Sequence, residues 1–163
     1  MSYKLIALDI DGTLRDTDDP VSDRTVTAID MVRSAGAIVT LVTGRTYEDA
    51  LPSVRELRIT APIISSQGAH IANPATEEVL LHLPLESNMA KTAIDALMPF
   101  NLEIIAFHPG TMFVTKMTER LDYFVNNRRI DIVLVDDLLL ASGQSPTRLV
   151  VLGSETEIND LET

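Results

Sequence analysis

The sequence predicts an α/β fold built around a parallel sheet, because apolar runs of strand length alternate with segments of helical periodicity. The runs at 5–10 and 37–42 are almost continuously apolar and end in acidic, glycine or polar residues. This pattern is typical of strands buried on both faces of a parallel sheet. Each run is followed by a segment in which apolar residues recur every three or four positions. Strand and helix in alternation indicate a doubly wound arrangement.

The first strand is expected at 5–10, and Ser22 is a suitable cap for the helix that follows, in which Val26, Ile29 and Val32 share one face. The second strand, 37–42, leads into a helical stretch whose apolar positions are 51, 54 and 57. Pro52 interrupts that stretch and is expected to kink or restart the helix.

The pattern changes after a third short strand at 63–64. Apolar runs at 69–71 and 79–83 flank Asn73-Pro74 and predict a hairpin. We therefore expect residues 1–84 to form one part of the protein and residues 85–163 a second α/β domain. The second domain is predicted to have helices at 89–97, 119–126 and from Ser154 onward, and strands at 102–107, 112–115, 132–135 and 148–152.

Composition excludes several classes of function. Asp and Glu number 24 against 13 Lys and Arg, so the net charge is −11 and nucleic acid is not an expected partner. The absence of cysteine excludes disulfides, zinc–thiolate sites and cysteine nucleophiles. No apolar stretch is long enough to cross a bilayer, so we expect no membrane contact and a cytoplasmic location. A phosphate-handling site in so negative a protein would need local positive charge.

The strongest chemical signal is Asp9-Ile10-Asp11-Gly12-Thr13, directly after the first strand. Alternation in an extended segment places both carboxylates on one side, at the carboxyl edge of the sheet. Two neighbouring acids repel each other, and a divalent cation such as Mg²⁺ relieves the repulsion and keeps Asp9 ionised. Asp9 is then a candidate nucleophile toward phosphorus, and Asp11 a candidate general acid and base. Both are candidate metal ligands.

This segment has two other interpretations. A lone Asp-x-Asp pair also occurs as a solvated acidic turn at the end of a strand. A calcium-binding loop that starts at Asp9 would have Leu14 where glycine is needed and Pro20 where a bidentate glutamate belongs, which excludes an EF-hand.

The second signal is Thr43-Gly44-Arg45, directly after the second strand. A hydroxyl group and a glycine amide near a helix N-terminus can hold phosphate oxygens. A right-handed crossover brings this turn beside the first one. Thr43, Gly44 and Arg45, together with the backbone at Gly12, are therefore candidate phosphate-binding residues. Alone, the pair Thr-Gly is more often an ordinary turn, and Arg45 could be a surface residue.

Together these motifs resemble the haloacid dehalogenase superfamily, and Gln67-Gly68-Ala69 after the third strand is similar to its Cof-like branch, in which an α/β cap is inserted. The resemblance implies a Rossmann-like (HAD-like) core and a magnesium-dependent phosphatase of small phosphorylated metabolites. It also implies that Asp9 is the nucleophile, that Asp11 is the acid/base and a metal ligand through its carbonyl, and that Thr43 binds the transferred phosphoryl group. The branch usually has asparagine where Gln67 stands, so no role is carried to Gln67.

The family's downstream lysine and its second acidic motif are not recognisable in these 163 residues. The chain is therefore expected to hold an incomplete core and most of a cap, and to self-associate through an exposed sheet edge. A sugar phosphatase, a nucleotide or cofactor phosphatase and a phosphomutase stay open. The rival from another class is a truncated or degenerate relative that binds a ligand or partner without catalysis. His70, His82 and His108 lack metal-ligand spacing and are expected at the surface or in the hairpin.

Overall fold

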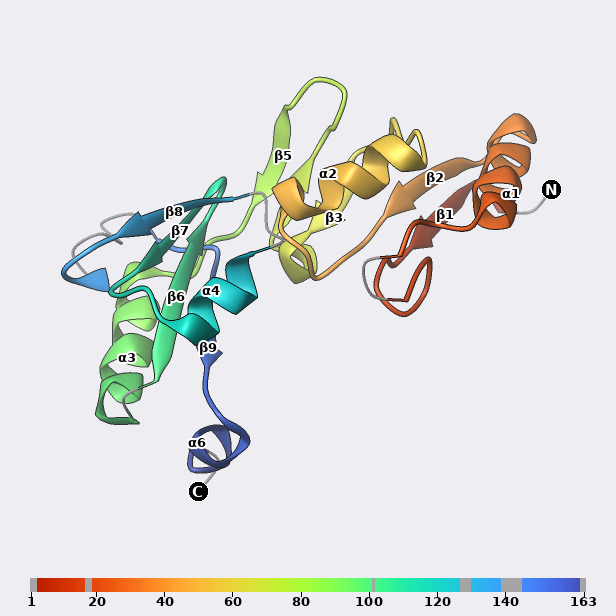
Figure 1. The fold of residues 1–163 in the computed structure, drawn as a ribbon. Coiled ribbons are helices and arrows are strands. Elements are labelled where there is room, and N and C mark those ends of the chain that lie inside the picture. Colours follow the sequence, from red (N-terminus) through yellow and green to blue (C-terminus); the bar gives the residue numbers. More distant parts are fainter. Residues whose placement is uncertain (1–2, 17–18, 101, 127–129, 139–144, 162–163) are drawn as a thin grey trace. The chain divides into compact units, whose positions relative to one another are not determined.

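The computed structural model describes residues 3–16, 19–100, 102–126, 130–138 and 145–161. The chain divides into two compact units, Met1–His82 and Leu83–Thr163. Figure 1 shows that each unit has its own strands and helices. The division falls next to the boundary expected at residue 84. Within the described ranges, no helix has the length and apolar character needed to cross a membrane.

The first unit is built on three strands, β1 (Leu5–Leu8), β2 (Ile38–Leu41) and β3 (Ile63–Ser65). β1 and β2 are parallel, with Leu5 opposite Ile38. Just beyond β2, Val42 forms a parallel bridge with Ile64 of β3. The predicted parallel arrangement is confirmed, and the turns that follow β1, β2 and β3 therefore lie at the same edge.

Helix α1 (Asp23–Ser34) follows β1 and begins as predicted, since the Ser22 side chain accepts a hydrogen bond from the Thr25 N–H at 3.2 Å. Its buried Ile29 joins Val39 and Leu41 of β2 in the main core of the unit. The periodicity of the apolar residues thus predicted both the helix and the face that it buries.

Helix α2 (Tyr47–Glu56) is capped by Thr46 and runs through Pro52 as one helix, so the predicted restart at Pro52 is wrong. Proline at this position removes one backbone donor. Ala50 and Val54, on the same helix, are both buried in the core. Their burial offsets the lost hydrogen bond and keeps the helix continuous.

The two faces of β1 differ in exposure, which corrects the expectation that this strand is buried on both. Ile6 and Leu8 are half-buried, whereas Leu5 is 58% exposed and Ala7 is also exposed. Ile38, opposite Leu5, is exposed as well. Side chains alternate between the faces of a strand, so one face packs under helices and the other is an apolar surface.

The predicted hairpin consists of β4 (His70–Ala72) and β5 (Val79–His82), which pair antiparallel. β4 also pairs antiparallel with β3, and the short 3₁₀ helix η1 (Ser66–Gly68) connects them. The hairpin therefore returns the chain directly beside the third turn of the sheet edge.

The second unit has a four-stranded sheet. Its strands lie in the order β8 (Asp131–Leu134), β7 (Thr111–Val114), β6 (Glu103–His108) and β9 (Arg148–Leu152). Its strands and helices closely match the predicted ranges. Hydrophobic residues of β6 and β7 form the centre of its core together with Leu121 and Val125 of one helix. The helices that the structure describes in this unit are α3 (Ser87–Leu97), η2 (Met98–Phe100), α4 (Glu119–Val125) and α6 (Glu155–Asn159).

Candidate functional site

The turn after β1 carries the two predicted carboxylates. Ile10 is fully buried, whereas Asp9 and Asp11 on either side of it are exposed. The Ile10 carbonyl accepts hydrogen bonds from the N–H groups of Leu14 and Arg15 at 3.0 and 3.2 Å. Burial of Ile10 and closure of this turn hold the two acids at the carboxyl edge of the strand, in solvent-accessible positions.

Gly12 makes this turn possible, because its φ of +74° lies in the left-handed region that favours glycine. Its N–H donates to the carbonyl of Arg15 at 2.9 Å. The positive φ and this bond explain why glycine stands in the turn. The contact of Gly12 with phosphate stays a prediction.

Arg15 ties the same turn to helix α2. Its guanidinium donates to the Ser53 hydroxyl and lies 3.6 Å from the Glu56 carboxylate. Glu56 also accepts a hydrogen bond from the Val21 N–H at 2.8 Å. The loop that contains the acids is thus attached to α2 at Arg15 and at Val21, a support that the sequence motif did not reveal.

The turn after β2 is held by backbone hydrogen bonds to β3 and to the segment after it. The Thr43 N–H donates to the Ile64 carbonyl at 2.9 Å, and the Thr43 carbonyl accepts from the Gln67 N–H at 3.2 Å. The Thr43 hydroxyl oxygen accepts from the Arg45 N–H at 3.1 Å, and the residue is only 3% exposed. Thr43 therefore shapes the turn from inside, while Gly44 is exposed at its tip.

Arg45 connects the first two turns directly. Its Nε and Nη2 donate to Oδ2 and Oδ1 of Asp11 at 2.9 and 2.6 Å. Paired parallel bonds of this kind are the strongest form of arginine–carboxylate contact. The structure thus brings together two residues that lie 34 positions apart in the sequence, and it pairs Arg45 with an acid rather than leaving it at the surface.

Two residues of the η1 turn have an unusual backbone. Ser66 and Gln67 have φ values of +50° and +57°, which non-glycine residues seldom adopt. The Ser66 N–H donates to the Arg45 carbonyl at 2.7 Å. A Cβ placed on Gly44 would lie 3.5 Å from Cγ of Gln67, so the Gln67 side chain lies beside Gly44. Backbone strain of this kind clusters at functional sites. The sequence contains no pattern that predicts it.

A row of rings lies beside this turn. His70 stacks edge-on against Tyr47 at 5.5 Å and against His82 at 5.7 Å between ring centroids. His70 is buried, and its Nδ1 lies 3.2 Å from the Ser65 hydroxyl. Burial, with a smaller effect from His82, lowers the pKa of His70 below its ordinary value of 6.5.

His70 lies in the predicted hairpin as the first residue of β4, although its side chain is buried there, and His108, at the end of β6, does not lie at the surface. His108 is 9% exposed, and its ring stacks edge-on against Phe113 at 5.0 Å. Both histidines end or begin strands whose neighbours cover them, which spacing along the sequence could not show.

We expect acid to destabilise the first unit through His70. The pKa of His70 is lowered in the folded state. Its contribution to the free energy of unfolding is therefore fully present above about pH 6.5, and it is lost as the pH falls through the lowered pKa. Urea unfolding should be measured at pH 7.5 and 5.5. Between these pH values the free energy of unfolding should fall less for His70→Gln, whose glutamine does not titrate, than for the wild-type chain. The same loss in both proteins would contradict this assignment.

The donors at the sheet edge are suited to magnesium by their chemistry. Mg²⁺ prefers oxygen and is usually held by one or two carboxylates together with water and substrate phosphate. Asp9 supplies an exposed carboxylate, and Asp11 supplies a second one whose two oxygens also accept the bonds from Arg45. Among the residues that the structure describes, no group of three or more acidic or histidine side chains gathers to hold a metal. The carboxylates therefore fit a sparsely protein-coordinated ion.

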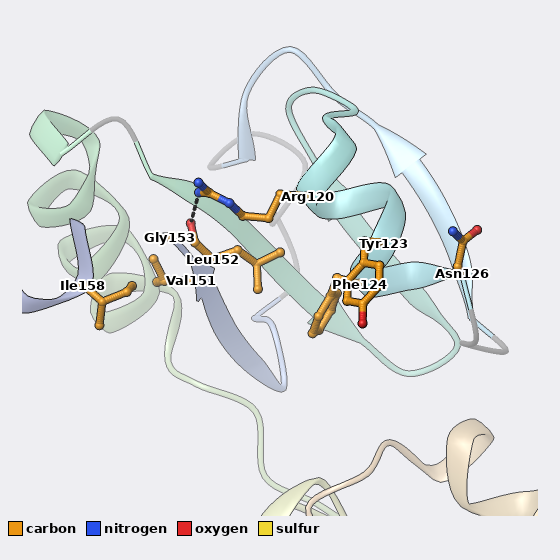
Figure 2. Close-up of a pocket in the computed structure, with 8 residues that line it drawn as sticks. All are labelled: Arg120, Tyr123, Phe124, Asn126, Val151, Leu152, Gly153 and Ile158. Carbon is orange, nitrogen blue, oxygen red and sulfur yellow. Dashed lines mark hydrogen bonds between the residues drawn. The ribbon is translucent and has the colours of Figure 1, made fainter. Parts of the chain in front are cut away.

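A separate pocket lies in the second unit, between α4, β9 and α6 (Figure 2). Arg120 crosses it and donates to the Leu152 carbonyl at 3.4 Å, and it also pairs with Glu103 and Glu157. A side chain at Gly153 would lie only 2.7 Å from Leu102. None of the predicted site residues lines this pocket. Its lining is Arg120, Tyr123, Phe124, Asn126, Val151, Leu152, Gly153 and Ile158.

Comparison with known proteins shows the family of this chain. The family model described as haloacid dehalogenase-like hydrolase matches residues 6–163. The 5-amino-6-(5-phospho-D-ribitylamino)uracil phosphatase YitU of Bacillus subtilis is 27% identical over 157 residues, which are 94% of this chain and 57% of that protein. The chain thus spans less than two thirds of this relative.

Solved structures show the same fold. A haloacid dehalogenase-like hydrolase from Bacteroides thetaiotaomicron superposes with a TM-score of 0.83 at 21% identity, over 98% of this chain and 62% of that one. A subclass IIB sugar phosphatase superposes with a TM-score of 0.77 at 18% identity, again over 98% and 62%. The match to the family model covers nearly the whole sequence and confirms the resemblance seen in its motifs. The chain belongs to the haloacid dehalogenase-like hydrolase family.

Proposed function

We propose that the whole protein is a magnesium-dependent phosphatase that hydrolyses a small phosphorylated metabolite through an aspartyl-phosphate at Asp9. The observation that carries this proposal is the arrangement of the sheet edge. β1 and β2 are parallel neighbours, and Asp11 of the first turn is bonded to Arg45 of the second. Two acids, a threonine turn and an arginine therefore share one edge, and the chain belongs to a hydrolase family.

The chemistry assigned to the two acids balances in two steps. A carboxylate oxygen of Asp9 forms a bond to phosphorus while the bond from phosphorus to the leaving oxygen breaks, and Asp11 gives that oxygen a proton. Asp11, now a carboxylate, takes a proton from water as the water attacks phosphorus, and the bond between Asp9 and phosphorus breaks. Inorganic phosphate leaves, and both acids return to their starting state.

The remaining predicted residues are assigned to binding. When magnesium is held by Asp9 and Asp11, it supplies positive charge against the substrate phosphate in a protein whose net charge is −11. The exposed tip at Gly44 and the backbone at Gly12 are assigned to phosphate oxygens. Thr43 is assigned to the transferred phosphoryl group, and its oxygen already accepts a bond from the turn, so its own proton is the one it can donate.

The substrate class is drawn from the relatives. One acts on a phosphorylated ribitylamino-uracil and another is named as a sugar phosphatase. The substrates in both names are small phosphorylated molecules. We assign Met1–His82 to the phosphatase core and Leu83–Thr163 to its cap, and we place the choice of leaving group in the cap.

Hydrolysis of p-nitrophenyl phosphate in the presence of magnesium tests the proposal. The protein from the complete reading frame is compared with the 163-residue chain and with the complete protein after chelation of magnesium. Activity of the complete protein that is lost on chelation and returns with magnesium supports the proposal. Absence of hydrolysis by every form, toward this compound and toward a panel of sugar phosphates, would overturn it.

The alternative is a degenerate relative that binds a ligand or a partner without turnover. It is favoured by the absence of a recognisable downstream lysine and second acidic motif from these 163 residues. Isothermal titration with magnesium and inorganic phosphate separates the two functions, since a binding protein would take up phosphate but release none from a phosphomonoester.

We further propose that the 163-residue chain associates with itself through the exposed side of β1. Leu5 and Ile38 form an apolar pair on that side. Leu5→Lys should weaken association by at least about tenfold, because burial of one leucine is worth about 1.5 kcal/mol or more. Sedimentation velocity over a range of concentrations measures the effect, and Met98→Lys in the second unit, where the Met98 side chain is also exposed, is the control. A wild-type chain that stays monomeric would contradict this proposal.

A further inference from the structure

Arg45 holds Asp11 with a fork that fixes the whole carboxylate. The two bonds, Nε to Oδ2 at 2.9 Å and Nη2 to Oδ1 at 2.6 Å, engage both oxygens. A single bond would let the carboxylate rotate about its axis, whereas two parallel bonds fix its plane. The side chain of Arg45 is 23% exposed and that of Asp11 is 50% exposed. The arginine is thus the more sheltered partner, and the acid is the one that faces solvent.

The backbone of Arg45 is fixed on both sides. Its N–H donates to the Thr43 hydroxyl at 3.1 Å, and its carbonyl accepts from the Ser66 N–H at 2.7 Å. Ser66 holds this position with a left-handed backbone, φ +50°. The guanidinium therefore extends from a point that is defined by the turns after β2 and β3 together. Through the fork, these two turns determine where the Asp11 carboxylate lies.

Asp11 lies in the turn that follows β1, and its side chain is half exposed. It follows the buried Ile10 and precedes Gly12, whose left-handed backbone turns the chain away. The two bonds from Arg45 restrict the rotamers that this half-exposed side chain can adopt. An acid that must meet a leaving oxygen within hydrogen-bond distance loses rate when its position is not fixed.

We propose that Arg45 is a positioning residue for Asp11, acting on the reaction through this acid and not mainly through contact with the substrate phosphate. The inference rests on the proposed function, since it needs Asp11 to be the general acid and base. It differs from the phosphate-binding role that the sequence alone suggested for Arg45. Lysine cannot replace arginine here, because one ammonium group offers a point charge and not a planar pair of donors.

A double-mutant cycle in the complete protein tests the inference. Steady-state hydrolysis of an alkyl phosphomonoester is measured with magnesium for the wild type, Arg45→Ala, Arg45→Lys, Asp11→Asn and the double variant Arg45→Ala with Asp11→Asn. Arg55→Ala, an exposed arginine on α2, is the control. Arg45→Ala should lower kcat by about 10²-fold with little change in KM, and Arg45→Lys should recover only a small part of the loss.

In the Asp11→Asn background the same substitution should change kcat by less than about threefold, because residues that act as a unit are not additive. An undiminished loss in that background, or a rise in KM without a fall in kcat, would show direct phosphate binding and overturn the inference. If the wild type is active and Arg45→Ala does not change kcat, the positioning role of Arg45 is overturned and the proposed function is not. A wild-type protein with no phosphatase activity would overturn the proposed function, and the positioning role with it.

Discussion

Asp9→Asn is expected to abolish phosphatase activity in the complete protein, with kcat for p-nitrophenyl phosphate falling by at least about 10³-fold. Removal of a covalent nucleophile costs more than removal of any group that assists it. The amide that replaces the carboxylate is neutral and cannot form the acyl phosphate. The substitution is nearly isosteric, and Asp9 is exposed at the end of β1. The fold should therefore be unchanged.

Two measurements establish this result. Thermal unfolding shows whether Asp9→Asn keeps the stability of the wild type, and acid quench during turnover, followed by intact mass, shows whether phosphate becomes attached to the protein. The wild type should gain one phosphoryl group at the Asp9 peptide and the variant none. Asp16→Asn, an exposed acid of the same loop, serves as the control and should keep its activity. Comparable activity in Asp9→Asn would remove this residue from the mechanism.

Asp11→Asn is expected to lower kcat by about 10²- to 10⁴-fold, the range associated with loss of a general acid or base. The size of the loss should depend on the leaving group. An aryl oxygen such as p-nitrophenolate leaves readily without a proton, so the first step suffers little with p-nitrophenyl phosphate. An alkyl oxygen needs the proton, so a sugar phosphate should suffer the larger loss.

This dependence distinguishes the two acids, because loss of Asp9 should affect both substrates alike. With p-nitrophenyl phosphate, Asp11→Asn should still form the aspartyl-phosphate and hydrolyse it slowly, since the base for water is missing. Rapid-quench measurements would then show a burst of p-nitrophenol followed by a slow steady rate. Equal losses on aryl and alkyl substrates, with no burst, would mean that Asp11 does not transfer the proton.

The elements and the positions of the motifs could be predicted from the sequence to a large extent. Ser22 caps α1 as expected, the hairpin forms around Asn73-Pro74, and the strands of both units lie near their predicted ranges. These features depend on local rules, namely capping chemistry, the period of apolar residues and turn preference. The placement of Asp9 and Asp11 after a strand depends on the same rules.

Other features required contacts between distant segments. Pro52 does not break α2, because buried neighbours on the helix compensate. Leu5 is exposed although its run of residues is apolar, because a strand's burial depends on what covers it and not on its own sequence. His70 is buried because its ring lies against Tyr47 and His82.

The sequence by itself determined the α/β class, the family and the two acids that carry the proposed chemistry. Only the tertiary structure decided what each candidate touches. It turned Thr43 inward to brace its turn, placed Gln67 beside Gly44, and set the Arg45 guanidinium on both oxygens of Asp11. The physical reason is that a carboxyl edge is assembled from turns far apart in the chain. The partner of a side chain there depends on the register of parallel strands, which the residues next to it do not encode.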